Sequence, residues 1–123
     1  MTIIQAINAI DDLCPNTYKR EKKIEQLSKL DGVIKKEIID KHEGSEEVTF
    51  NGYDENTPLD TELLIPAPYD DIYVFWLQTW IDYWNGEIKK YNNSTSMYKA
   101  AYSNFERAYN REHMPKETKI KYF

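Results

Sequence analysis

The stretch Pro66-Ala-Pro-Tyr-Asp-Asp-Ile-Tyr-Val-Phe-Trp-Leu-Gln-Thr-Trp-Ile-Asp-Tyr-Trp-Asn-Gly86 decides the fold, because it gathers all three tryptophans into one almost continuous apolar run. Its apolar residues recur at intervals of three and four, and further apolar residues cover the other sides, so a helix here would be apolar nearly all round. Such a helix is normally central. We therefore expect three largely buried tryptophans: Trp76, Trp80 and Trp84.

The start of this helix is well specified. Pro68 suits a first helical turn, where its missing N–H is no loss. Asp70 and Asp71 place negative charge at the positive end of the helix dipole, which explains them better than an acid/base pair does. We predict a helix from about Pro68 to Tyr91.

The N-terminal segment predicts a short helix. Thr2 and Gln5 match a capping box, in which the two residues satisfy each other's free backbone N–H groups. The helix that follows stops before Pro15, which cannot continue it. One face carries Ile3, Ile7, Ile10 and Cys14.

A second helix, capped by Asn16 or Thr17, follows and is expected to end near His42. Asp31-Gly32 interrupts its apolar stripe, but the stripe resumes in phase, so one long helix is favoured over two. The stripe consists of Ile24, Leu27, Leu30, Ile34 and Ile38.

The periodicity changes after this helix. Val48 to Tyr53, with Asn51-Gly52 inside it, predicts a small β-hairpin or irregular insertion. A last helix is expected from about Ser94 to Glu112, with Met97, Ala101, Phe105, Ala108 and Tyr109 on one face.

The predicted architecture is mainly α: a four-helix bundle-like domain with a long central aromatic helix and an extended C-terminal tail. A chain of 123 residues is large enough for one such domain. We assign residues 1–115 to the helical domain and residues 116–123 to an arm, because the sequence after Pro115 alternates as a strand does.

Composition restricts the function classes. Cys14 is the sole cysteine, which excludes an internal disulfide, and the N-terminal residues do not resemble a secretion signal, so we expect a cytosolic chain. The run from Ile72 to Trp84 is too short and too interrupted to span a bilayer. Aromatic residues make up 14% of the chain, which suits either an aromatic core or a protein interface.

Candidate catalytic and metal-binding residues are few, and we expect no enzyme, no cofactor and no metal. His42 and His113 lack neighbouring ligand residues at metal-binding spacing and are expected at the surface. Cys14 lies on an apolar face and is expected to be a packed thiol. The basic run Lys19–Lys23 is interleaved with acidic residues in a chain of net charge −5, which favours a solvated helix face over nucleic-acid binding.

Several segments together resemble the small head-tail connector (adaptor, or head-completion) proteins of long-tailed phages and prophages. The resemblance covers roughly residues 12–116, and its motifs are structural rather than catalytic. They are Leu30-Asp-Gly32 with Ile34, Glu37-Ile38-Ile39, His42-Glu-Gly44, Leu64-Ile-Pro-Ala-Pro-Tyr-Asp-Asp71, Tyr83-Trp-Asn-Gly-Glu87, Tyr91-Asn-Asn93 and Tyr109-Asn-Arg-Glu-His-Met-Pro115.

The resemblance implies a helical, non-enzymatic subunit that assembles as a homo-oligomeric ring beneath the portal of a DNA-filled capsid. Its partners would be the portal protein, neighbouring connector subunits and a downstream tail or stopper protein, with no membrane and no sequence-specific nucleic acid. The chain would reside at the virion head-tail junction, and in the host cytoplasm before assembly. From the residues themselves we infer partner-binding positions at Phe50, Tyr53, Lys116, Lys119, Lys121, Tyr122 and Phe123.

Two other classes remain open. A small cytosolic helical regulatory or protein-interaction module would be equally acidic and would form a stable dimer or complex. A helical nucleic-acid-binding domain would bind in a strongly salt-dependent manner. The arm could also pair with the Val48–Tyr53 segment of its own chain rather than with a partner.

Overall fold

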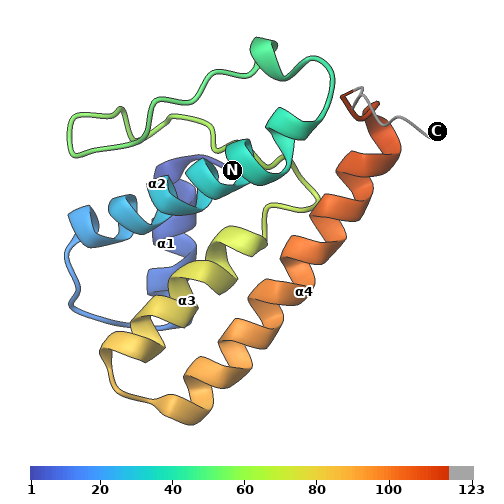
Figure 1. The fold of residues 1–123 in the computed structure, drawn as a ribbon. Helices are drawn as coiled ribbons and strands as arrows, with labels where there is room; N and C mark the ends of the chain where they lie inside the picture. The colour runs from blue at the N-terminus through green and yellow to red at the C-terminus, as the bar shows by residue number, and fades with distance from the viewer. Residues whose placement is uncertain (117–123) are drawn as a thin grey trace.

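The computed structural model describes residues 1–116 and is mainly helical, as predicted (Figure 1). Four α-helices form the domain, and two short 3-10 helices follow the second of them. In chain order the elements are α1 (Ile3–Leu13), α2 (Arg20–Glu37), η1 (Ile39–Lys41), η2 (Ser45–Glu47), α3 (Ile72–Trp84) and α4 (Ile88–Glu112).

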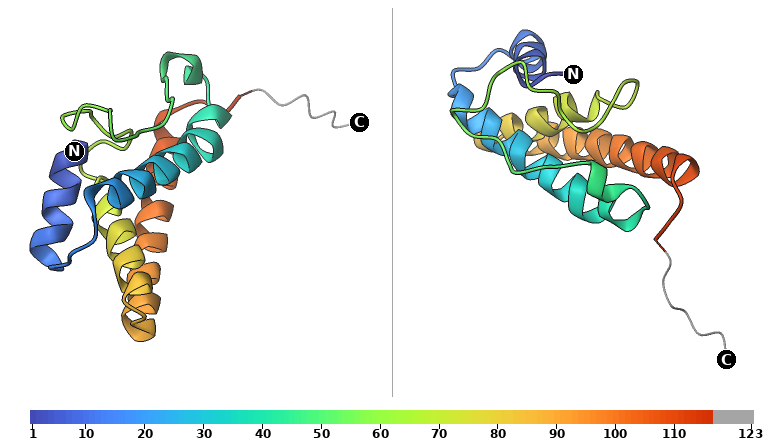
Figure 2. Two further views of the ribbon diagram at one scale, coloured as in Figure 1. Left: turned by 90° about the vertical axis from the view of Figure 1, so that its left-hand side faces the viewer. Right: turned by 90° about the horizontal axis from the view of Figure 1, so that it is seen from above.

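Helix α3 is the centre of the domain, because it contacts α1, α2 and α4. Helices α3 and α4 run antiparallel side by side, while α2 crosses them and α1 packs beside α2 and α3 (Figures 1 and 2). The side of α3 that faces the other helices is fully buried and consists of Ile72, Tyr73, Leu77 and Ile81.

Helix α1 begins as predicted. The Gln5 backbone N–H donates to Thr2 Oγ1 at 3.2 Å, and the Thr2 N–H donates to Gln5 Oε1 at 2.9 Å, so the capping box is confirmed. Three of the four predicted facing residues are buried, namely Ile3, Ile7 and Ile10. Cys14 caps the helix end and is half-buried.

Helix α2 is continuous through Asp31-Gly32, and all five residues of its predicted stripe are buried. It begins at Arg20, later than predicted, because Asn16 bonds elsewhere: its amide donates to Asp11 Oδ1 at 3.0 Å and its Oδ1 accepts from the Tyr18 N–H. The α-helix ends at Glu37, and η1 continues the turn almost to His42.

The predicted helix from Pro68 to Tyr91 is wrong at both ends. Helix α3 starts at Ile72, and the chain turns at Asn85-Gly86, where Gly86 has a φ of 73° that only glycine adopts without strain. Helix α4 therefore begins at Ile88, six residues before the predicted Ser94. Within α4 the predicted face is largely correct, since Ala101, Phe105 and Ala108 are buried, while Met97 is 46% exposed.

The predicted hairpin over Val48–Tyr53 is not formed, and residues 48–71 follow an irregular path along α2 and past the start of α1 (Figure 2). The reason is that this segment bonds to α2 instead of to itself. The Tyr53 N–H donates to Ser28 Oγ at 2.9 Å, and the Tyr53 hydroxyl donates to Asp31 Oδ2 at 2.5 Å.

The prediction that the tryptophans are largely buried is confirmed only in part, because each of the three is covered over part of its surface and none is fully buried. A helix that is apolar all round does not reveal which side its neighbours cover. Tyr73 reaches Asp31 of α2 and is fully buried, whereas Trp76 bonds to the Gln26 carbonyl of α2 and packs on Tyr98 of α4 without being fully covered.

The C-terminal segment is attached where it leaves α4. The Glu43 N–H donates to Met114 O at 2.8 Å, and the Lys116 N–H donates to Lys41 O at 2.9 Å. As far as Lys116, the chain leaving α4 thus pairs with residues 41–43. Residues 117–123 lie outside the described part of the chain.

Candidate functional site

Eight aromatic rings form a continuous cluster along α3 and α4, which we call the aromatic band. Each ring has its centroid within 6.3 Å of another ring of the band. All eight keep part of their surface exposed to solvent. The band consists of Tyr18, Trp76, Trp80, Tyr83, Trp84, Tyr91, Tyr98 and Tyr102.

The band arises from helix periodicity. Tyr91, Tyr98 and Tyr102 are separated by seven and four residues, which places them on one face of α4. The hydroxyl of Tyr102 donates to Glu37 Oε2 at 2.8 Å and so connects α4 to the end of α2. Burial, followed by the charge of Glu37, raises the pKa of Tyr98 to about 12, so this phenol stays protonated at neutral pH.

Three buried side-chain polar atoms in the described part of the chain have no hydrogen-bond partner: Gln26 Oε1, Trp80 Nε1 and Thr95 Oγ1. They come from α2, α3 and α4, and Trp80 is itself a member of the band. The backbone carbonyl of Gln26 accepts from Trp76 Nε1 at 2.8 Å, and Thr95 lies one turn beyond Tyr91 on α4. Buried polar groups are nearly always paired, so these three atoms are exceptions within the described part of the chain.

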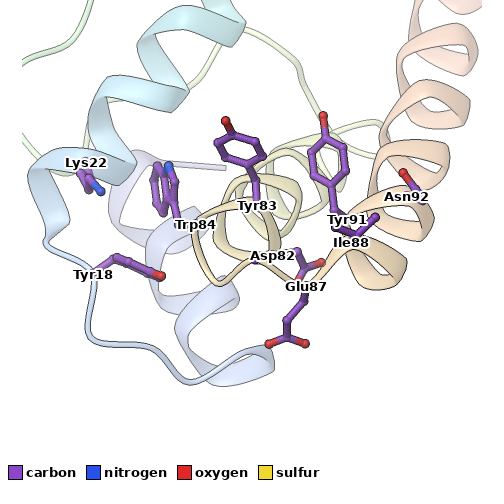
Figure 3. A pocket seen from close by; sticks show the side chains of 10 residues that line it. Tyr18, Lys22, Asp82, Tyr83, Trp84, Glu87, Ile88, Tyr91 and Asn92 are labelled. Atoms are coloured by element: carbon purple, nitrogen blue, oxygen red, sulfur yellow. The ribbon is translucent and has the colours of Figure 1, made fainter.

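A pocket of about 750 Å³ opens where the band reaches the turn between α3 and α4, and we call it the tip pocket. Its lining is mostly apolar. Two of its residues are strongly exposed to solvent, Tyr83 with 59% and Ile88 with 72% of the surface accessible. Figure 3 shows Trp84 standing between Lys22 of α2 and Tyr83 of α3. The Lys22 Nζ lies 4.4 Å from the Trp84 ring centroid, close enough for a cation–π contact.

The charged groups of the tip pocket already have partners. Asp82 is buried and accepts from the Ser94 hydroxyl at 2.6 Å, while Glu87 forms a 2.7 Å ion pair with Lys90. Burial, and next the charge of Asp82, raises the pKa of the Cys14 thiol, which disfavours the nucleophilic thiolate. The tip pocket is therefore suited to binding apolar groups.

Sequence reasoning missed a buried carboxylate at Asp31, which is fully inaccessible to solvent. Its Oδ1 accepts from the Tyr73 hydroxyl at 2.6 Å, and its Oδ2 accepts from the Tyr53 hydroxyl at 2.5 Å and the Leu64 N–H at 3.0 Å. Burial raises the pKa of Asp31, and the three donors oppose that rise. The Tyr73 hydroxyl also accepts from the Ile65 N–H at 2.8 Å, so this network attaches residues 53–65 to α2 and α3.

This network predicts loss of stability at alkaline pH. Burial, and next the charge of Asp31, raises the pKa of Tyr53 and Tyr73 above their ordinary value of about 10. The unfolded chain therefore ionises first, so the contribution of these groups is complete below about pH 10 and is lost as the pH rises further. We expect Tyr73→Phe to flatten the decline by about 1.4 kcal/mol per pH unit in urea unfolding, and an unchanged slope would contradict this role.

The partner-binding residues predicted from the sequence are not brought together at the band. Phe50 and Tyr53 pack edge to face, with ring centroids 5.0 Å apart, on α2 near Asp31 and Gly32. Lys116 lies beside Lys41, beyond the end of α2. The other four predicted positions lie outside the described residues: Lys119, Lys121, Tyr122 and Phe123.

The prediction that both histidines are surface residues is wrong for His42, and His113 lies beside it with ring centroids 6.3 Å apart. His42 is buried and contacts Ile38 O through Nδ1 at 2.6 Å and Asn110 Oδ1 through Nε2 at 2.7 Å. His113 stacks on the Tyr109 ring with centroids 3.7 Å apart. Within residues 1–116, no cluster of three or more His, Cys, Asp or Glu side chains is arranged to hold a metal ion.

Comparisons with known proteins identify no relative: no family model, no curated protein and no solved structure matches this chain. None of the helices within residues 1–116 combines the length and apolar character needed to cross a membrane.

Proposed function

We propose that this chain is a structural head-tail connector (adaptor) subunit of a long-tailed phage or prophage. It assembles as a ring under the portal and joins the capsid to the tail. The proposal rests first on the sequence resemblance. It is supported by the aromatic band, which leaves eight large rings partly exposed on one small domain. Tyrosine and tryptophan are enriched at protein interfaces because each combines a large apolar body with a polar tip.

A closed ring requires two different contact surfaces on each subunit, and this chain offers them at opposite ends of α4. The tip pocket lies at the start of α4, and the chain leaves the other end of α4 toward Lys116 (Figure 1). A helix of 25 residues separates the two by about 37 Å. Such a separation suits a contact in which the front of one subunit meets the back of the next.

The proposed role requires neither catalysis nor a cofactor. The buried ionisable groups are used to hold the fold: Asp31 accepts from two tyrosines, Asp82 binds Ser94, and Lys23 Nζ pairs with Asp11 at 2.7 Å. A net charge of −5 also suits a component that lies along the path of DNA without binding it tightly.

The test is complementation of tail joining. Heads carrying the portal are isolated from a strain of the parent phage or prophage that lacks this chain, and purified full-length protein is added before tails. We expect the protein to bind these heads and restore infectious particles. The double variant Tyr83→Ser with Ile88→Ser should reduce joining at least about tenfold, whereas the control Met97→Ser, exposed on another face of α4, should not.

Two results would contradict the connector role. If heads that lack the chain join tails at the normal level, the connector role fails. If the protein ignores heads but is recovered as a stable dimer or in a complex with a non-virion protein, the alternative of a small helical protein-interaction module is correct.

A further inference from the structure

We propose that the tip pocket binds the 116–123 arm of a neighbouring copy of this chain, so that subunits join head to tail. This contact specifies how subunits of the proposed ring would join. It rests on the proposed connector function only in that a portal is needed for the ring to close. The occupant is thus a segment of the same sequence, supplied by another subunit.

The pocket is shaped for apolar side chains at its rim. Tyr83 and Ile88 are the two most exposed apolar residues on its walls, and they come from either side of the α3–α4 turn. Tyr91 stands beside Tyr83, with ring centroids 5.7 Å apart, as Figure 3 shows. Trp84 closes the other side, where Tyr18 packs on it at 5.0 Å. An incoming aromatic side chain would be surrounded by rings.

The arm has the matching composition. Ile120, Tyr122 and Phe123 are apolar or aromatic and alternate with Lys119 and Lys121. Three lysines and one glutamate give residues 116–123 a net charge of +2, which leaves −7 for residues 1–115 of a chain at −5. Opposite charges on the two parts favour their encounter.

The arm of the same chain is too short to fill this pocket. It continues from Lys116, which is bonded to Lys41 beyond the end of α4. Seven further residues extend at most about 25 Å. The start of α4, where the pocket lies, is about 37 Å from its end. Only a second copy can supply the segment.

A contact of this kind uses different surfaces on the two partners, so each subunit still has one free pocket and one free arm. Repetition of the contact produces a ring when the rotation closes. A single short segment binds weakly by itself, but a portal that holds many copies together raises their effective concentration. The chain can therefore be monomeric in dilute solution and joined on the portal.

The experiment titrates a synthetic peptide of residues 116–123, Lys-Glu-Thr-Lys-Ile-Lys-Tyr-Phe, into the full-length protein. The peptide has no tryptophan, so the protein's tryptophan fluorescence reports binding beside Trp84. We expect a saturable change with wild type and binding about tenfold weaker with Tyr83→Ser or Ile88→Ser. Met97→Ser is the control and should bind as wild type does. Circular dichroism checks that each variant is folded.

A second measurement uses full-length chains only. A pocket variant (Tyr83→Ser with Ile88→Ser) and an arm variant (Tyr122→Ser with Phe123→Ser) are each expected to be monomeric at concentrations where wild type associates. Their mixture should yield a one-to-one complex and nothing larger, because it contains one intact pocket and one intact arm per pair. Sedimentation velocity measures this.

The proposal is overturned if the peptide does not bind, or if it binds wild type and both pocket variants equally. These outcomes are separate from the portal test. Peptide binding with no attachment to heads would refute the connector role and support the arm contact. Attachment to heads without peptide binding would support the connector role and refute the arm contact.

Discussion

Replacing Asp31 by alanine is expected to lower the free energy of unfolding by about 3–5 kcal/mol, the cost of removing one partner from a buried charged network. The change leaves the hydroxyls of Tyr53 and Tyr73 and the N–H of Leu64 without their acceptor. Tyr53 lies partly at the surface and can recover a bond to water, but Tyr73 is fully buried. Urea unfolding followed by circular dichroism measures the loss.

Two control variants separate the network from a general effect of charge. Asp31→Asn keeps an acceptor for the Leu64 N–H and nearly the same shape, so it should cost clearly less than alanine. Asp12→Ala, at an exposed position on α1, should change the stability by less than about 0.5 kcal/mol. A loss below about 1 kcal/mol for Asp31→Ala would show that the network contributes little to holding residues 53–65 in place.

The sequence contained a signal for this network. Asp31 is four residues after Leu27 and three before Ile34, so it lies on the apolar stripe itself and not beside it. A carboxylate on a stripe that is otherwise buried requires donors. Which residues provide these donors could not be predicted, because Tyr53 and Tyr73 lie 22 and 42 residues away in sequence.

The helices themselves were predictable where local chemistry fixes them. The capping box at Thr2 and the stripe of α2 depend on residues a few positions apart, and both predictions are confirmed. The predicted boundary between α3 and α4 is wrong because the local pattern there supports two readings. Asn85-Gly86 is a strong helix-ending pair, yet the apolar residues before it and Ile88 and Tyr91 after it look like one helical run.

The aromatic band could be only half predicted. Its composition indicated either a core or an interface, and the spacing of Trp76, Trp80 and Trp84 fits both. The choice depends on which face of α3 receives α1 and α2, a property of tertiary packing. Most of the large fully buried residues of α3 are aliphatic. Tyr73 is the aromatic exception, and its hydroxyl donates a hydrogen bond to Asp31.

Replacing His42 by alanine is expected to cost about 2–4 kcal/mol, since it removes a buried ring and two hydrogen bonds. The ring bridges Ile38 O and the Asn110 side chain, and it packs edge to face on Tyr109 at 4.9 Å. It thereby connects the end of α2 to the end of α4. His113→Ala is the matched control, because that ring is half-exposed and bonds Tyr109 O only at 3.2 Å, so its loss should cost less than about 1 kcal/mol.

The same substitution tests whether the attachment of the arm is fixed by the fold. His42 lies between the two backbone bonds that connect residues 41–43 to Met114 and Lys116. When the ring is removed, these bonds lose their support, and their amide hydrogens should exchange faster in His42→Ala than in His113→Ala. If the exchange of the Glu43 and Lys116 amides is the same in both variants, the start of the arm is held by its backbone pairing alone. If it differs, the buried histidine helps to hold the pairing of residues 41–43 with residues 114–116.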